Sequence, residues 1–334
     1  MKSYKILFFC TLILGTLITI SAYSWLSMWM GLEINLLSII PLLKDKNNVY
    51  PSEAALKYFI TQALASSIFL FSIILTLNLS EFFNFSEFSI LITNSALLMK
   101  IGAAPFHSWF PEVMEGLNWM NATIMLTWQK IAPMVLIFYN SNLTFFLLAV
   151  ILFSSIISGI IGLNQISLRK ILAYSSINHI SWLLASMINS QTIWTIYFLV
   201  YVIITVNITL ILKYFNIFYL LQLQNLMGQS KLFKFFFMMN FLSLGGLPPF
   251  LGFFPKWLVI NNLVINQFYL MSVILIIFTL ISLYFYLRIS FSTLMISTNE
   301  IMLNFENPSN FWVYFFNFVS LSGLLACTLI FNFI

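Results

Sequence analysis

The chain has 334 residues, of which 61% are hydrophobic and only 7% are charged, and its mean hydropathy is +0.99. A soluble protein cannot bury so much apolar surface, so the composition predicts an all-α polytopic membrane protein. The two cysteines, Cys10 and Cys327, lie far apart and form no CxxC or Cys/His cluster. This excludes the usual sequence patterns of iron–sulfur and zinc sites.

The N-terminal segment imitates a secretory signal, because Lys2 and Lys5 precede an apolar run. Ile20-Ser21-Ala22 is a poor cleavage site, however, and further apolar runs follow at once, so we interpret the segment as the first membrane span. An Arg- and Ser-rich presequence is also absent, so a protein of this kind in an organelle is expected to be made there.

Polar and turn-rich stretches divide the chain into eleven apolar runs of about 20 residues, the length of a transmembrane helix. The predicted spans are 4–22, 25–43, 54–79, 88–110, 121–140, 143–163, 170–189, 193–214, 235–259, 265–288 and 311–332. We expect one membrane domain over 1–334, with a first half at about 1–140, a second half at about 141–290, and a connector and terminal helix at 291–334.

The basic residues predict the orientation of these spans. Apart from three lysines inside the spans, every basic residue falls on the same face as the N-terminus: Lys2, Lys5, Lys44, Lys46, Lys57, Arg169, Lys170, Lys213, Lys231, Lys234 and Arg288. The connectors of the opposite face carry only the acids Glu81 and Glu87. By the positive-inside rule, the N-terminus faces the cytoplasm, or the matrix in a mitochondrion, and the C-terminus faces the other side.

Four charged residues lie inside predicted spans: Glu33, Lys100, Lys130 and Lys256. A charge at the centre of a bilayer costs about 2.5–3.5 kcal/mol even on insertion scales, so such residues usually mark a path for protons or ions. A buried carboxylate would protonate unless it had a basic partner, so Glu33 is expected to pair with one of the lysines, as a functional or a structural salt bridge.

Each of the three lysines lies near a predicted helix interruption. Lys100 precedes Gly102 and Pro105, Lys130 precedes Pro133, and Lys256 follows the run Gly245-Gly246-Leu247-Pro248-Pro249. Proline removes a backbone donor, and a broken helix is tolerated in a membrane only where protein or water satisfies it. The lysines are therefore expected to titrate beside water; the alternative is that they snorkel to the membrane surface.

The two histidines are further relay candidates. His179 lies in the polar stretch Tyr174-Ser175-Ser176-Ile177-Asn178-His179, and histidine titrates near neutral pH. A hydrogen-bonded core histidine is the alternative for His179. His107, which follows Pro105, is a secondary relay candidate.

Two segments hint at an internal repeat. Residues 105–111 read PFHSWFP and residues 249–255 read PFLGFFP, with Pro, Phe, Phe and Pro at matching positions. Paired interrupted helices in two halves are typical of inverted-repeat transporters, so we expect an antiporter-like inverted repeat with two broken helices.

These charges suggest an order of proton transfer. Glu33 would hold Lys100 in its charged form, and breaking the pair would release a proton toward Lys130 and then Lys256, through water and the His179 region. The chain carries no Walker motif and no Rossmann glycine fingerprint, so its energy is expected to come from a partner or an ion gradient.

Four motifs carry a family resemblance: KIGAAPFHSWFPEVMEG from Lys100, TWQK at Lys130, RKILAYSSINHISW around His179, and GGLPPFLGFFPKW before and after Lys256. Together they resemble the antiporter-like subunits of respiratory complex I. The resemblance covers the whole chain and implies a proton-translocating membrane-arm subunit of the H+-translocating NADH:ubiquinone reductase in the mitochondrial inner membrane. It assigns proton translocation to Glu33, Lys100, Lys130, His179 and Lys256.

The resemblance also implies partners and cofactors. NADH, FMN, iron–sulfur clusters and ubiquinone belong to other subunits, so this chain is expected to bind no cofactor and no metal. Other membrane-arm subunits and lipids, cardiolipin among them, are the expected partners, and nucleic acid is not. Family members outside animals have fourteen helices, so eleven spans imply the loss of three at the N-terminus. The alternatives are a stand-alone sodium/proton antiporter and a scaffold subunit whose buried charges are purely structural.

Overall fold

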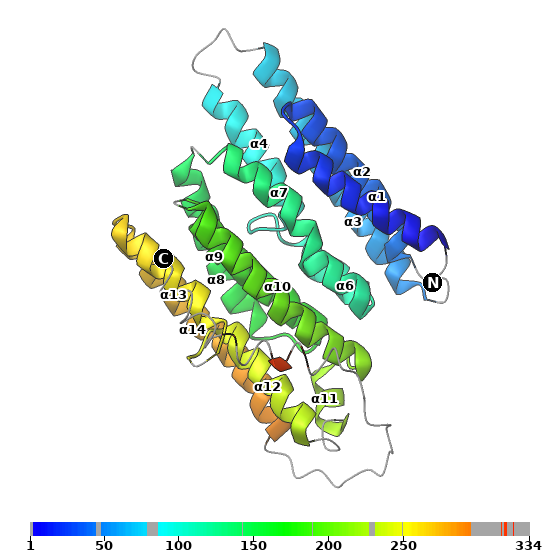
Figure 1. The fold of residues 1–334 in the computed structure, drawn as a ribbon, viewed down its shortest axis with the longest axis vertical. Helices are drawn as coiled ribbons and strands as arrows, with labels where there is room; N and C mark the ends of the chain where they lie inside the picture. The colour runs from blue at the N-terminus through cyan, green and yellow to red at the C-terminus, as the bar shows by residue number, and fades with distance from the viewer. Residues whose placement is uncertain are drawn as a thin grey trace. The chain divides into compact units, whose positions relative to one another are not determined.

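The computed structural model describes residues 3–44, 48–78, 86–141, 143–188, 190–226, 231–248 and 250–294, and the single residues 315, 317, 318 and 323. Apart from an isolated bridge between Ser167 and Tyr219, the described residues form helices, turns and loops (Figure 1). The chain forms two compact units, 1–150 and 151–334. The predicted terminal span, 311–332, falls almost entirely outside the described residues, as do Lys2, Lys46 and Glu81.

The first unit contains seven helices within the described ranges and the start of an eighth: α1 (Ser3–Ser21), α2 (Trp25–Leu43), α3 (Tyr50–Asn78), α4 (Ser86–Ile101), α5 (Trp109–Gly116), α6 (Trp119–Leu126), α7 (Trp128–Tyr139) and α8 (Thr144–Gly162). Helices α1, α2 and α3 lie side by side, with α4 and α5 against α3, and α7 against α4 (Figure 1).

Helices α1 and α2 approach closely where small residues meet. A Cβ atom added at Gly31 would lie 2.6 Å from Thr19 Cγ2, and one added at Gly15 would lie 3.0 Å from the backbone nitrogen of Asn35. Small residues allow such approaches between membrane helices, where water does not drive association. The contact fixes the part of α2 that carries Glu33 and Asn35.

The second unit continues from α8 with α9 (Leu168–Met187), α10 (Gln191–Tyr214), α11 (Leu220–Leu226), α12 (Lys231–Gly245), α13 (Phe253–Ile265) and α14 (Tyr269–Leu294). Helix α9 contacts α10, α13 and α14, and every residue of α9 except Arg169, Lys170 and Tyr174 is buried. It is therefore the core helix of this unit.

Three buried amides join α10, α12 and the C-terminal segment. Asn207 Nδ2 donates to the side-chain oxygens of Asn240 and Asn317, both at 2.9 Å, and Asn240 Nδ2 donates to Asn317 Oδ1 at 2.6 Å. Buried amides are stabilised by hydrogen bonds to one another, and here such bonds link three segments of the chain.

Seven stretches of the described chain are long and apolar enough to cross a membrane: Ser3–Ser21, Trp25–Leu43, Tyr50–Leu77, Trp119–Tyr139, Thr144–Gly162, Gln191–Tyr214 and Tyr269–Phe291. The predicted span 121–140 is divided between α6 and α7, and two further predicted spans each contain a helix end. Helix α4 ends at Ile101 rather than 110, and the predicted span 235–259 contains the end of α12 at Gly245 and the start of α13 at Phe253. In both places a glycine with positive φ, Gly102 or Gly246, ends the helix.

Candidate functional site: buried lysines and their polar partners

Lys100 lies in the last turn of α4 and is 7% exposed. The helix ends in a Schellman motif, because Ala103 N–H donates to Leu98 O at 3.1 Å, Gly102 N–H donates to Met99 O at 3.2 Å, and Gly102 has φ +79°. Lys100 lies at this helix end, beside the interruption expected at Gly102 and Pro105, because Gly102 adopts a conformation that other residues rarely reach.

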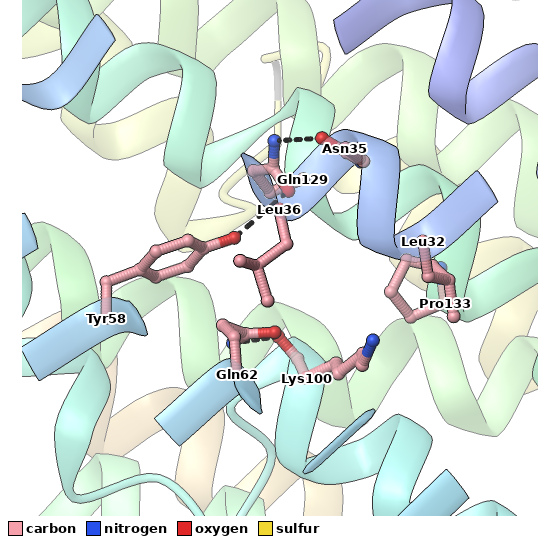
Figure 2. A pocket seen from close by; sticks show the side chains of 8 residues that line it. All are labelled: Leu32, Asn35, Leu36, Tyr58, Gln62, Lys100, Gln129 and Pro133. Atoms are coloured by element: carbon pink, nitrogen blue, oxygen red, sulfur yellow. Dashed lines mark hydrogen bonds between the residues drawn. The ribbon is translucent and has the colours of Figure 1, made fainter. Parts of the chain in front are cut away.

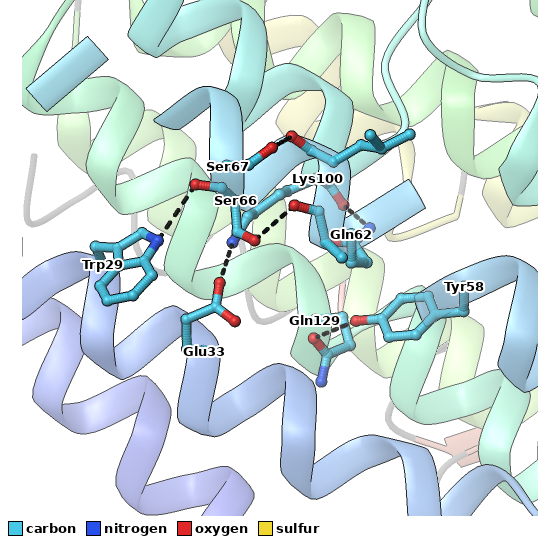
Figure 3. Close-up of polar contacts among 10 residues, drawn as sticks. Trp29, Glu33, Tyr58, Gln62, Ser66, Ser67, Lys100 and Gln129 are labelled. Carbon is cyan, nitrogen blue, oxygen red and sulfur yellow. Dashed lines mark hydrogen bonds and ion pairs between the residues drawn. The ribbon is translucent and has the colours of Figure 1, made fainter. Parts of the chain in front are cut away.

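Glu33 of α2 faces Lys100 of α4 (Figure 3). The Lys100 ammonium lies 4.0 Å from Glu33 Oε1, and the two side chains are 4% and 26% exposed. Glu33 Oε1 has no hydrogen bond to any described residue. A buried ion pair repays the loss of hydration only with close, well-satisfied geometry, so this contact is a loose ion pair.

A small polar cavity adjoins Lys100 (Figure 2). Its lining consists of Leu32, Asn35, Leu36, Tyr58, Gln62, Lys100, Gln129 and Pro133. The volume open to the centre of a water molecule is about 10 Å³, which corresponds to about one water. Because Lys100 contributes to the wall, a water here would lie next to the lysine.

The polar groups of this cavity are linked to one another. Tyr58 OH donates to Gln129 Oε1 at 3.3 Å, Gln129 Nε2 donates to Asn35 Oδ1 at 2.9 Å, and Gln62 Nε2 donates to the backbone oxygen of Lys100 at 3.3 Å (Figure 2). The sequence analysis did not single out any of these four side chains. The sequence feature that could have identified them is an amide or a phenol inside an apolar run, because such a group is costly to bury unless it is paired.

Lys130 lies near the start of α7 and is 1% exposed. Its ammonium lies 5.9 Å from the centre of the Phe110 ring, within cation–π range. Helices α6 and α7 meet at Thr127, whose φ and ψ are −114° and −70°, and Pro133 cannot donate to the carbonyl of Gln129. Lys130 therefore follows the cavity-lining Gln129 directly in an irregular stretch of backbone.

Lys256 lies in the first turn of α13 and reaches back to the end of α12. Its ammonium donates to Leu244 O at 3.1 Å and to Gly245 O at 2.8 Å, and it is 8% exposed as a residue. The carbonyls at a helix C-terminus carry the negative end of the helix dipole, so they stabilise the charged ammonium. Lys256 is turned inward, whereas snorkelling would extend it outward.

Helix α12 also ends in a Schellman motif, with Leu247 N–H donating to Leu242 O at 3.3 Å and Gly246 N–H donating to Ser243 O at 3.0 Å. Gly246 has φ +78°. A Cβ atom at Gly246 would lie 2.9 Å from the Lys256 ammonium nitrogen, so glycine is needed for backbone conformation and for space.

His179 is buried in α9, and its Nδ1 lies 2.9 Å from the hydroxyl of Tyr197. The ring of Tyr201 lies 5.0 Å from the His179 ring. His107, in contrast, lies in the loop between α4 and α5, where its Nδ1 lies 3.3 Å from Pro105 O.

The structure thus brings together Glu33 and Lys100, places Lys130 next to the residues of the same cavity, and buries Lys256 and His179 in the second unit. Within the described ranges, no three His, Cys, Asp or Glu side chains come close enough to hold a metal ion.

Comparison with known proteins identifies the family of this arrangement. The family described as NADH:quinone oxidoreductase/Mrp antiporter, TM, matches residues 22–282. The chain is 51% identical to NADH-ubiquinone oxidoreductase chain 2 of Anopheles gambiae, over 97% of both chains.

Two solved structures share the fold. A chain of respiratory complex I from Thermus thermophilus aligns with a TM-score of 0.83 and 24% identity, over 97% of this chain and 78% of that one. A chain of the Mrp complex from Dietzia sp. aligns with a TM-score of 0.76 and 17% identity, over 90% of this chain and 61% of that one. The protein is an all-helical, antiporter-like membrane protein, and it belongs to the NADH:quinone oxidoreductase/Mrp antiporter family and, within it, to the NADH-ubiquinone oxidoreductase chain 2 proteins.

Proposed function

We propose that this chain is a proton-translocating membrane-arm subunit of NADH:ubiquinone oxidoreductase in the mitochondrial inner membrane. Redox chemistry in other subunits, which hold the NADH, FMN, iron–sulfur and ubiquinone sites, drives the transport. The proton path consists of Glu33, Lys100, Lys130, His179, Lys256 and water, with His107 as a secondary relay.

The observation that carries this proposal is the environment of Lys100. A buried lysine, a loosely paired carboxylate and a cavity of water size lie together at the end of α4. Burial alone would favour loss of the lysine proton, whereas a nearby carboxylate favours the charged form. Moving Glu33 toward or away from Lys100 therefore changes how firmly the lysine holds its proton.

The energy involved is of the right size. Moving one charge against a membrane potential requires about 2.3 kcal/mol per 100 mV. Making or breaking a partly buried charge pair changes a lysine's proton affinity by amounts of this order. Transport then follows when redox-driven changes elsewhere in the complex move the Glu33 pair, and when the released proton passes to Lys130 and onward.

The proposal includes the membrane arrangement. Helices α4 and α5 form one interrupted span, α12 and α13 form another, and with the terminal span the chain crosses the membrane eleven times. The two interrupted spans belong to an inverted repeat whose halves are residues of about 1–140 and 141–290. The N-terminus lies in the matrix and the C-terminus in the intermembrane space, and neighbouring subunits and lipids, including cardiolipin, cover the outer helices.

A sodium/proton antiporter is the second candidate, because the Mrp likeness extends over 90% of this chain. Sodium is held by several oxygen ligands, and a carboxylate is the usual source of their charge. Here the carboxylate of the pair faces an ammonium, which repels a cation. The geometry therefore supports protons rather than sodium as the transported ion.

The test replaces each lysine by an uncharged side chain of similar length. Lys100→Met and Lys256→Met should abolish proton uptake coupled to NADH oxidation in purified complex reconstituted into vesicles, measured with a pH-sensitive dye. Lys213→Met is the matched control, because Lys213 is exposed at the end of α10 and should leave coupling unchanged. Wild-type proton stoichiometry in both test variants would mean that the subunit is a scaffold.

A further inference from the structure

One face of α9 carries four polar or aromatic side chains at helical spacing: Ser175, Asn178, His179 and Trp182. Groups from three other helices meet this face. Tyr197 of α10 contacts His179, Ser282 of α14 accepts from Asn178 Nδ2 at 2.9 Å, and the Lys256 ammonium of α13 lies 6.0 Å from the Trp182 ring. This face of α9 therefore carries His179 at one point and lies against Lys256 of α13 at another.

Three polar atoms along this route are buried without a hydrogen bond to any described residue: Asn178 Oδ1, Trp182 Nε1 and the hydroxyl of Tyr286. Their residues are 3%, 1% and 1% exposed. Buried polar atoms almost always have a partner, and where the protein provides none, the usual partner is an ordered internal water that bridges several such groups. Two of the three lie on α9 one helical turn apart, and the third lies on α14, which packs against α9.

Tyr286 is held rigidly at this point. Its ring centre lies 4.5 Å from that of Phe285 and 6.1 Å from that of Phe241. Its hydroxyl lies next to Ser175, whose own hydroxyl donates to Leu172 O at 2.8 Å. Because the Ser175 hydroxyl already donates to Leu172 O, it offers no hydrogen bond to the phenol oxygen, which can accept from another donor.

The same phenol connects to the tyrosines around His179. The phenol of Tyr286 lies near those of Tyr197 and Tyr201 of α10. Tyr197 contacts His179 directly, and Tyr201 hydrogen-bonds the side chain of Ser176. The phenol of Tyr286 therefore belongs to the same buried group of polar side chains as Tyr197, the hydrogen-bonded partner of His179.

We propose that Asn178 Oδ1, Trp182 Nε1 and the Tyr286 hydroxyl bind ordered water between α9 and α14, and that Tyr286 passes protons along this water between His179 and Lys256. In each transfer, the phenol oxygen accepts a proton from one neighbour on a lone pair and releases its own proton to the next, so its net charge is unchanged. Asn178 and Trp182 are positioning residues, because they hold the water and do not exchange the transported proton. The inference rests on the proposed function and adds a residue to its path.

Tyr286→Phe tests the relay, because it removes the hydroxyl and keeps the ring that packs on Phe241 and Phe285. Tyr284→Phe is the matched control: it makes the same change on the same helix, at a side chain that is 61% exposed. In reconstituted complex, Tyr286→Phe should lower the rate of coupled proton uptake several-fold and change its solvent deuterium isotope effect, while assembly stays normal. Tyr284→Phe should match the unmodified complex in all three. Equal rates and isotope effects in the two variants would overturn the relay.

The unmodified complex provides a second test, which does not depend on how a variant folds. A high-resolution map should show water within hydrogen-bond distance of at least two of the three orphaned atoms. A map of that quality with no water there would overturn the inference.

Lys256→Met, measured alongside, separates the two proposals. Normal pumping in both Lys256→Met and Lys100→Met overturns the proposed function. Lost pumping in Lys256→Met, together with unchanged pumping in Tyr286→Phe, overturns the relay alone.

Discussion

The end of α4 in the first unit and the end of α12 in the second have the same backbone but different caps. Both helices close with a Schellman motif whose glycine, Gly102 or Gly246, has a φ near +80° (+79° and +78°). In both, the matching segment of proline and phenylalanine begins three residues later. The two ends are therefore alike in backbone, and the side chains that reach them make the difference.

The carbonyls two residues before these glycines belong to Lys100 and Leu244, and each receives a donor. Lys100 O accepts from the neutral amide of Gln62 at 3.3 Å, whereas Leu244 O accepts from the Lys256 ammonium at 3.1 Å. In the first unit the lysine side chain is left to face Glu33. In the second unit the lysine is itself the cap, so the protonation of Lys256 and the stability of the helix end depend on each other.

Gly246→Ala should cause the largest loss of thermal stability and proton uptake among the variants that probe these two helix ends. An L-residue with positive φ costs about 1–2 kcal/mol, and the new Cβ atom would also lie 2.7 Å from Lys256 Cδ and 2.9 Å from its ammonium nitrogen. The ammonium would then leave its carbonyls. We expect a lower thermal midpoint and loss of coupled proton uptake in the reconstituted complex.

Gly102→Ala and Gly245→Ala are the controls for that change. Gly102→Ala brings the same backbone strain, but its Cβ atom would meet only Phe110 Cβ at 3.2 Å and Trp109 at 3.3 Å. Gly245 needs no positive φ, and its nearest neighbour would be Leu283 at 3.4 Å, an ordinary contact. If Gly102→Ala and Gly246→Ala impair proton uptake equally, the cap formed by Lys256 has no special role.

Gln62→Leu should have an intermediate effect. The substitution leaves the Lys100 carbonyl without its amide donor, and an unsatisfied buried polar group costs about 1–3 kcal/mol. Gln62 is 4% exposed, so bulk water does not replace the lost donor. Thermal unfolding of the complex should show the loss, whereas Gln191→Leu, at an exposed glutamine that begins α10, should not. Equal midpoints for the two variants would contradict the capping role of Gln62.

Lys57→Met should have the smallest effect. Lys57 pairs with Glu112 at 3.0 Å and Glu53 at 3.2 Å, but its side chain is 44% exposed, and exposed ion pairs are weak and screened by salt. Glu112 directly follows the segment 105–111, as Lys256 directly follows the matching segment 249–255. We expect coupled proton uptake at the unmodified level and at most a small, salt-dependent fall in thermal midpoint. A large loss of proton uptake would show that the positions of Glu112 and Lys256 share a function.

Much of the framework was predictable from the sequence, because it depends on local signals. The apolar runs predicted membrane helices, and the buried positions of Lys100, Lys130 and Lys256 follow from their place in these runs. Glycine and proline predicted interruptions near Gly102 and Gly246, and α4 and α12 end there. The proton-transfer roles of the lysines stay predictions.

The partners of these lysines were less predictable, because they come from distant parts of the chain. Gln62 and Lys100 are 38 residues apart, and Gln129 and Asn35 are 94 residues apart. Only packing decides which of several polar residues in apolar runs meet. Hydropathy alone also does not mark the helix ends at Ile101 and Gly245, because each lies inside an apolar run.

The three-amide cluster of the second unit has a consequence for biosynthesis. Asn317 follows Asn240 by 77 residues and Asn207 by 110 residues. In a chain that is still being synthesised, the amides of α10 and α12 are therefore present before their third member has been made. Until residue 317 has been synthesised, those amides lack one hydrogen-bonding partner. They are then expected to bind water or an insertase, and the second unit is expected to complete its packing only afterwards. A messenger truncated before that codon should consequently yield a product that the organelle's quality-control proteases recognise and degrade.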